Sequence, residues 1–141
     1  MRRRLVVPLL FSTAASVLVA CADDTDAPAP ASPESAAADS QEYPDILEAE
    51  LTASGDEFRI SVTVSSPYDT PERYADGWRV LTPEGDVLAE HDLAHDHQNE
   101  QPFTRSRGPF AIPDDVDEVV VEGRDQDNGY GGDTVTVPVP R

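Results

Sequence analysis

The residues of this chain best suited to metal chemistry are its three histidines, which all fall within seven positions. Neutral imidazole is a common protein ligand for Zn²⁺ and Cu²⁺, and the carboxylate of Glu100 can supply a further ligand. On an extended strand His95 and His97 point to the same side, about 6–7 Å apart, and His91 joins them if the strand is continuous. A Zn or Cu(II) site at His91, His95, His97 and Glu100 is therefore one hypothesis. A solvated acidic loop that contains three histidines is the favoured interpretation.

Two arginines and one tyrosine are the other residues suited to ligand contact. Arg105 and Arg107 stand at period 2 in a chain with 10 basic and 28 acidic residues. Guanidinium groups in this pattern are suited to hold an anion, a carboxylate or a partner, unless both pair with neighbouring Asp and Glu. Tyr130 lies between Gly129 and Gly131. It is predicted to be either an exposed aromatic at a loop tip or a lid folded over the core.

The residue pattern does not indicate a catalytic centre. The chain has no Lys, which excludes Schiff-base chemistry and a P-loop lysine, and it has no Gly-x-Ser-x-Gly motif. Carboxylates are too frequent for one catalytic pair to be singled out. One Cys excludes an internal disulfide. Cu(I) lacks soft ligands, because the Met is removed with the leader described below and the single Cys is expected to be acylated. We therefore expect a protein that is not an enzyme.

The segment 125–129, Asp-Gln-Asp-Asn-Gly, is similar to the start of a calcium loop. It departs from the EF-hand pattern because Gly129 stands where a ligand belongs and Thr136 replaces the bidentate Glu. A glycine-rich hairpin turn is the favoured interpretation.

The first twenty residues are predicted to be an export signal. Residues 2–4 are arginines, and residues 5–20 form an apolar run that falls short of the ~20 residues needed to cross a bilayer. The run ends in Leu18-Val19-Ala20-Cys21, which resembles the lipobox of bacterial lipoproteins. The resemblance implies cleavage before Cys21, lipid attachment to its sulfur, acylation of its amine and a membrane anchor. An ordinary secretory signal is the alternative, and general secretion is favoured over twin-arginine export.

Residues 21–42 are predicted to be a disordered linker behind the lipidated Cys21. After the cysteine the stretch is built mainly of Ala, Pro, Ser, Asp and Glu, with no aromatic or large aliphatic residue. Such a segment buries too little apolar area to offset the entropy of ordering. As a flexible tether its r.m.s. reach is on the order of 25 Å.

Residues 43–141 are predicted to form one domain of short β-strands. Apolar residues alternate with polar ones in segments separated by turn signals. In the first segment Leu47, Ala49, Leu51 and Ala53 are expected to share one face. The expected strands cover residues 47–53, 58–66, 72–81, 87–93, 103–112 with a break at Gly108-Pro109, 118–124 and 134–140.

About seven short strands are typical of an all-β sandwich of the immunoglobulin-like or fibronectin-III-like kind. Trp78 is expected in the core of that sandwich, and Pro138 favours an edge position for the last strand. Residues 125–133, rich in glycine, are expected to be a turn. A small barrel is the alternative architecture.

The net charge and a second resemblance limit the functions that this protein can have. A formal charge of −18 excludes nucleic acid as a partner, because phosphates are repelled. Residues 74–106, together with GYGGDTVTV, are similar to an uncharacterised group of small exported bacterial proteins, which implies export and no particular activity.

We expect a lipoprotein of the cell envelope, anchored at Cys21 to the outer face of the cytoplasmic membrane or in the periplasm or outer membrane. Its sandwich is expected to be a binding or structural module for a protein or small ligand of unknown identity. Divalent-metal binding at the histidines is the alternative function.

Overall fold

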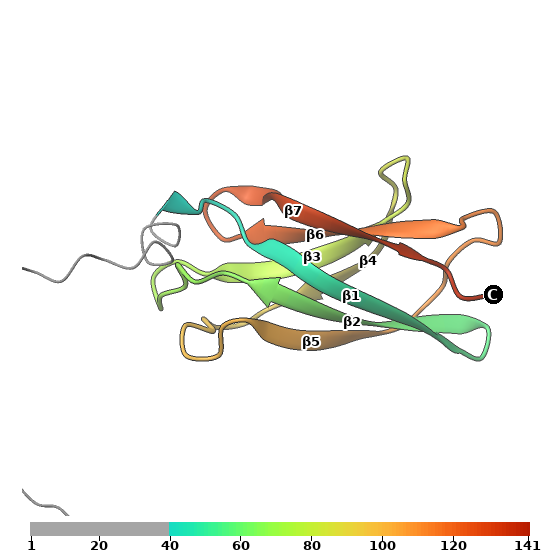
Figure 1. The fold of residues 1–141 in the computed structure, drawn as a ribbon, viewed down its shortest axis with the longest axis horizontal. Coiled ribbons are helices and arrows are strands. Elements are labelled where there is room, and N and C mark those ends of the chain that lie inside the picture. The colour runs from blue at the N-terminus through green and yellow to red at the C-terminus, as the bar shows by residue number, and fades with distance from the viewer. Residues whose placement is uncertain (1–39) are drawn as a thin grey trace, which may run out of the picture. The chain divides into compact units, whose positions relative to one another are not determined.

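A computed structural model describes residues 40–141 (Figure 1). The predicted leader at residues 1–20, Cys21 and the linker as far as residue 39 lie outside these residues. In the part of the chain that is described, no helix has the length and apolar character needed to cross a membrane. The strands are β1 (Asp45–Ser54), β2 (Glu57–Ser65), β3 (Ala75–Leu81), β4 (Val87–Asp92), β5 (Phe103–Phe110), β6 (Glu118–Asp125) and β7 (Gly129–Pro138).

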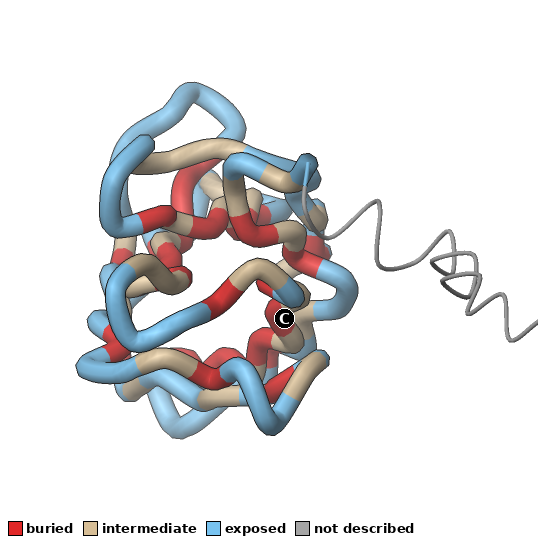
Figure 2. The backbone as a smooth tube through the Cα atoms, turned by 90° about the vertical axis from the view of Figure 1, so that its left-hand side faces the viewer, coloured by how far each residue is buried: buried red, intermediate tan, exposed pale blue. Residues whose placement is uncertain are grey.

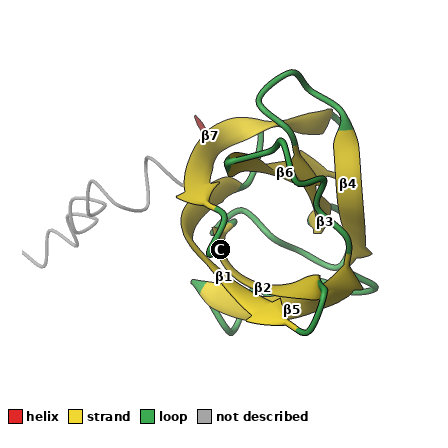
Figure 3. Ribbon diagram, turned by 90° about the vertical axis from the view of Figure 1, so that its right-hand side faces the viewer, coloured by secondary structure: helices red, strands yellow, loops and turns green. Residues whose placement is uncertain are grey.

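The seven strands form two antiparallel sheets. One has the order β1-β2-β5 and the other the order β4-β3-β6-β7. Figure 3, which looks along the strands, shows the two sheets facing each other. β1 lies beside β7 on one side, and β4 approaches β5 on the other. The prediction of an all-β fold with seven strands is confirmed, as is the edge position of the strand that carries Pro138.

The core lies between the sheets and is built from alternate residues of each strand. Ile60, Val62 and Val64 of β2 are fully buried, and Trp78 and Val80 of β3 face them from the other sheet. Figure 2 shows buried segments alternating with exposed ones along the chain. The period of 2 in the sequence is therefore the period of burial, as expected for strands with one solvated face.

The predicted face of β1 is wrong at its start. Ile46 pairs with Val64 while Glu48 pairs with Thr63, so Leu47 is the extra residue of a β-bulge. The bulge leaves Ile46 buried and Leu47 54% exposed. Since one inserted residue moves the following side chains to the other face, a strict alternation from Leu47 could not predict this register.

Two strand boundaries also differ from the prediction. β5 continues through Gly108 and Pro109 as one strand, but its register with β2 shifts at the predicted break, since Arg107 pairs with Ile60 and Phe110 with Phe58. Because β5 is an edge strand, Pro109 need not donate to a ladder. β7 begins at Gly129, so residues 129–133, expected as part of a turn, belong to a strand. Residues 129–131 pair with β6, and the register shifts directly after them.

The loops are divided between two ends of the domain. At one end, which we name the Tyr43 end, residues 41–44 meet the loops at residues 66–74, 93–102 and 126–128. The opposite end carries the turns that join β1 to β2 and β3 to β4, the loop before β6, and the carboxyl terminus (Figure 1). The predicted histidine cluster therefore belongs to the end through which the chain enters the domain.

Candidate functional site

His91 is packed on the only tryptophan of the chain. It lies on β4 in register with Trp78, and their rings are stacked with centroids 4.8 Å apart and planes at 23°. Burial lowers the pKa of His91, and the positive charges of Arg107 and Arg105 lower it further while Asp92 opposes them. His91 is therefore held mainly in its neutral form near pH 7.

His95 and His97 lie together in the loop between β4 and β5. Their ring centroids are 4.7 Å apart, and the His97 ring also stacks on Phe103 at 3.9 Å. His97 is only 2% exposed. Its backbone N–H donates to Asp69 Oδ2 at 3.0 Å, and its buried Nδ1 has no hydrogen-bond partner among the described residues. Burial, followed by the charge of Arg105, lowers the pKa of the ring.

Glu100 pairs with an arginine. Its Oε2 accepts a hydrogen bond from Arg105 Nη2 at 2.9 Å, and this bond lowers the pKa of the Glu100 carboxyl. Of the four residues predicted to hold Zn²⁺ or Cu²⁺, the structure brings His95 and His97 together and places His91 against Trp78. Within residues 40–141 no group of three or more His, Cys, Asp or Glu side chains is arranged to hold a metal ion.

Arg105 and Arg107 lie on the inner face of an edge strand. In the ladder between β5 and β2, Arg105 pairs with Val62 and Arg107 pairs with Ile60. Both of these β2 residues are fully buried. Arg105 forms an ion pair with Glu100. Arg107 is exposed and has no ion pair or side-chain hydrogen bond within the described part of the chain.

Tyr130 lies on β7, where the prediction had a loop tip or a lid over the core. It is half-buried on the outer face of the four-stranded sheet. Its hydroxyl donates to Glu90 Oε1 at 2.7 Å, and the guanidinium of Arg79 lies 3.7 Å above its ring centre. Burial and the bond to Glu90 raise the pKa of Tyr130. The ring is therefore part of a charged network on a sheet surface.

The same outer face carries ion pairs that join three of the four strands of its sheet, namely β3, β4 and β6. Arg79 of β3 pairs with Glu122 of β6 at 2.7 Å. Arg124 of β6 donates to Asp76 at 2.7 Å and reaches Asp92 of β4 at 2.9 Å. These pairs cross strands that meet only in the tertiary structure, so the sequence analysis did not find them.

Gly77 of β3 makes room for the ion pair between Arg124 of β6 and Asp92 of β4, which spans β3. It lies between Arg124 and Asp92 in the register of the sheet. A Cβ atom at position 77 would stand 2.6 Å from the backbone oxygen of His91 and 3.0 Å from Arg124 Nη2. Only a residue without a side chain leaves the path of the Arg124 guanidinium open.

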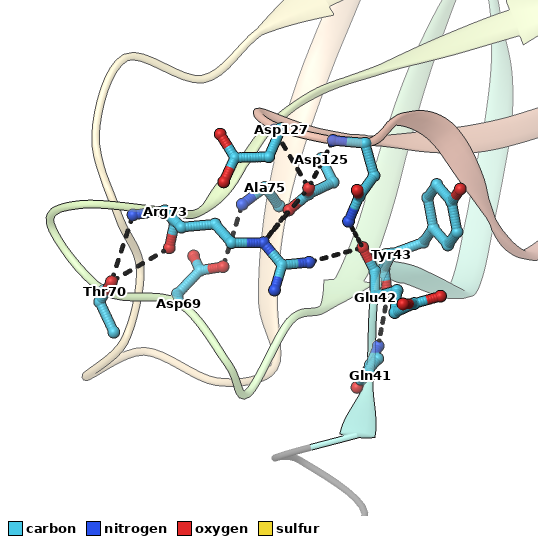
Figure 4. A network of polar contacts seen from close by, with 10 residues as sticks. Gln41, Glu42, Tyr43, Asp69, Thr70, Arg73, Ala75, Asp125 and Asp127 are labelled. Carbon is cyan, nitrogen blue, oxygen red and sulfur yellow. Dashed lines mark hydrogen bonds and ion pairs between the residues drawn. The ribbon is translucent and has the colours of Figure 1, made fainter.

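At the Tyr43 end a second network, centred on Arg73, ties the incoming chain to two loops. Arg73 Nε donates to both carboxylate oxygens of Asp125, at 3.3 and 3.2 Å, and Nη2 donates to the backbone oxygen of Glu42 at 2.7 Å (Figure 4). The side-chain amide of Asn128 donates to the same oxygen at 3.0 Å. The start of the domain is therefore fixed by side chains that follow β2 and β6.

Asp125 is the first residue of the calcium-like segment, and its carboxylate oxygens already accept hydrogen bonds from the protein. Besides the bonds from Arg73, its Oδ1 accepts the backbone N–H groups of Asp127 at 3.1 Å and Asn128 at 2.9 Å. The carboxylate closes the turn before β7 and is 1% exposed. This agrees with the interpretation of the segment as a hairpin turn.

Asp69 is the second buried carboxylate, at 3% exposed. Its two oxygens accept backbone N–H groups of Ala75 and His97, both at 3.0 Å. Burial raises the pKa of Asp69, and the two N–H bonds partly offset that effect. The side chain therefore joins the loop before β3 to the loop that carries the histidines.

Comparison with known proteins gives one informative relative. A protein of Halomicrobium mukohataei described as "Putative lipoprotein" is 41% identical to this chain over 86 residues, which are 61% of this chain and 42% of the relative. The chain thus spans about two fifths of the length of that relative. No family model matches the chain. No solved structure matches it either.

Proposed function

We propose that this protein is an exported lipoprotein whose β-domain is held outside the membrane by acyl chains on Cys21. The observation that carries the proposal is the 41% identity to a protein described as a lipoprotein. The 86 aligned residues outnumber those that precede Tyr43, so the alignment includes part of the β-domain. The Leu18-Val19-Ala20-Cys21 motif supplies the attachment sites, which are the sulfur of Cys21 and, after cleavage, its amine. Several acyl chains give a stable anchor, which one chain cannot.

We infer that the β-domain is a binding or structural module and not an enzyme. Both carboxylates buried in the described residues, Asp69 and Asp125, accept backbone N–H groups and are not free to transfer protons to a substrate. The chain enters at the Tyr43 end, which leaves the opposite end and the outer faces of both sheets open to a partner. Divalent-metal binding, the alternative function, has no three-residue ligand group to support it in residues 40–141.

We further infer that the domain is a sandwich closer to the fibronectin-III-like than to the constant-type immunoglobulin arrangement. In the latter the fourth strand joins the sheet of the first two strands. Here β4 pairs with β3 in the other sheet, and Trp78 is fully buried on β3.

Metabolic labelling with an alkyne analogue of palmitate tests the anchor. We expect the wild-type chain to incorporate label, to enter the detergent phase on Triton X-114 partition and to lose its first twenty residues. The Cys21→Ala variant should lose the label and enter the aqueous phase. Ser16→Ala, a change within the same leader, is the matched control and should behave as wild type. Mature protein that is unlabelled and found in the cytosol would overturn the proposal.

A further inference from the structure

The side of the sandwich between β4 and β5 gathers positively charged and donor groups. The two strands are the free edges of their sheets and approach each other. His91 lies on β4, and Arg105 and Arg107 lie on the inner face of β5. Both arginines lie in the strand that approaches β4, and their charges lower the pKa of His91. We name this group, with Trp78 beneath it, the β4–β5 seam.

Arg107 is the uncompensated charge of the seam. Residues 40–141 contain seven arginines. Five of them form ion pairs, namely Arg73, Arg79, Arg105, Arg124 and Arg141. Of these seven, Arg59 and Arg107 have no ion pair, although the chain has 28 acidic residues. Arg59, also unpaired, lies between the buried residues Phe58 and Ile60 and so faces the outer side of the three-stranded sheet.

A buried donor lies in the same stack. Trp78 is fully buried, and within the described residues its indole Nε1–H has no hydrogen-bond acceptor. Buried N–H groups without a partner are rare in folded proteins, and each calls for an explanation. The His91 ring is stacked on this indole, and β4, which carries His91, approaches the strand that carries Arg107. The seam thus contains a guanidinium, an imidazole and an indole N–H. The neighbouring carboxylates of Glu100 and Asp92 are each paired with an arginine, Glu100 with Arg105 and Asp92 with Arg124.

We propose that the β4–β5 seam binds the carboxylate of a monocarboxylic ligand, with Arg107 as its principal contact and His91 as the second. This inference deepens the proposed function by naming the ligand class of the binding module. A planar guanidinium matches a carboxylate with two parallel hydrogen bonds. A monoanion is favoured over a phosphate dianion because only one arginine of the seam is uncompensated and the chain as a whole carries −18.

Trp78 fluorescence in the purified mature lipoprotein, held in a neutral detergent, provides the readout because Trp78 is the only tryptophan. We would titrate acetate and N-acetyl-glycyl-glycine at constant ionic strength set with chloride. Both ligands should give a saturable change in Trp78 emission. The ligand that binds more tightly shows whether the seam prefers a free acid or the terminal carboxylate of a peptide chain. NMR signals of the arginine Nε–H groups report binding independently of the indole.

Matched variants make the test specific. Arg107→Ala should weaken acetate binding at least tenfold, whereas Arg59→Ala, which changes the net charge equally, should leave it within twofold. Glu100→Gln releases Arg105 and should tighten binding. Affinity should also rise as the pH falls through the pKa of His91, which Asp92 raises and Arg105 and Arg107 lower. That rise should be absent in His91→Gln.

Three results would overturn the inference. The first is the absence of a saturable change in both readouts, the second an equal loss of binding in Arg59→Ala and Arg107→Ala, and the third tighter binding of inorganic phosphate than of acetate at pH 7. None of these results bears on Cys21, so acylation of Cys21 together with a seam that binds nothing would leave the lipoprotein proposal intact.

Discussion

His91 lies nearly flat on Trp78, with ring centroids 4.8 Å apart and an interplanar angle of 23°. The pair joins β4 to β3 on the inner face of the four-stranded sheet, next to the edge where β5 approaches. Because Trp78 is fully buried and unique in the chain, its emission reports on this one site. The stack links the core of the domain to the titration of a single histidine.

Trp78 emission should fall as the pH is lowered, because a protonated imidazole quenches an indole with which it is stacked. The midpoint should lie below 6.5, since burial lowers the pKa of His91 and Arg107 and Arg105 lower it further against the opposing effect of Asp92. Fluorescence titration of wild type, His91→Gln and the matched control His95→Gln tests this. The transition should vanish only in His91→Gln, and a midpoint above 6.5 in wild type would contradict the assignment.

The domain should lose stability as the pH falls from 7.5 to 5.5. The pKa values of His91 and His97 are both lowered by folding. The unfolded chain therefore binds protons first, and stability is lost as the pH drops through the unfolded value near 6.5 toward the folded values. The slope is up to about 1.4 kcal/mol per pH unit for each proton by which the two states differ. Asp69 acts in the opposite sense, since its raised pKa favours the folded state at lower pH.

Urea unfolding at the two pH values, in wild type and in the His91→Gln/His97→Gln double variant, measures this dependence. The double variant is expected to start less stable and to show a flatter dependence on pH over this range. Equal slopes in the two proteins would argue against the histidines as its source.

Gly77→Ala should destabilise the domain by about 1–3 kcal/mol, because the new methyl group meets a backbone oxygen that cannot move aside. Arg124→Ala alone removes two ion pairs, at Asp76 and Asp92, that are partly open to solvent, and should cost about 1 kcal/mol. Chemical denaturation of both single variants and the double variant gives the coupling between the positions. The double variant should lose less unfolding free energy than the sum of the two single losses. Strict additivity would show that Gly77 is not required for the ion pair between Arg124 and Asp92.

Asp125→Ala should cost roughly 2–4 kcal/mol, since it leaves Arg73 and two backbone N–H groups without their buried acceptor. Asp127→Ala, an exposed position in the same turn, is the matched control and should change stability by less than about 0.5 kcal/mol. Thermal unfolding followed by circular dichroism compares the two variants. Similar losses in both would mean that the turn, and not the carboxylate of Asp125, holds the Tyr43 end.

Much of the fold could be predicted from the sequence because burial in this domain follows a local pattern. The alternation Phe58, Ile60, Val62 and Val64 matches the buried face of β2 residue for residue. Prediction failed at Leu47, where a bulge shifts the register, and at residues 129–131, which were expected in a turn and pair with β6. Both errors concern pairing with another strand, about which local sequence carries little information.

The candidate site was predictable only as a set of residue types. The sequence drew attention to His91, Arg105 and Arg107, which all belong to the seam. It grouped His91 with His95 and His97 because they are close in the chain, whereas the structure places His91 on a strand against Trp78 and the other two in the following loop. Arg73 went unnoticed, since its partners Asp125 and Glu42 are distant in sequence.

By itself, the amino-acid sequence determined the β class of this protein and the burial of most strand residues, because side-chain alternation is a property of each strand alone. It also supplied the net charge on which the expectation of no nucleic-acid partner rests, and the leader that leads to the lipoprotein proposal. The tertiary structure alone decided which charges are neutralised and which, like Arg107, are left free. Ion pairs, stacking and desolvation depend on distances across strands and loops, and those distances exist only after the two sheets have packed together.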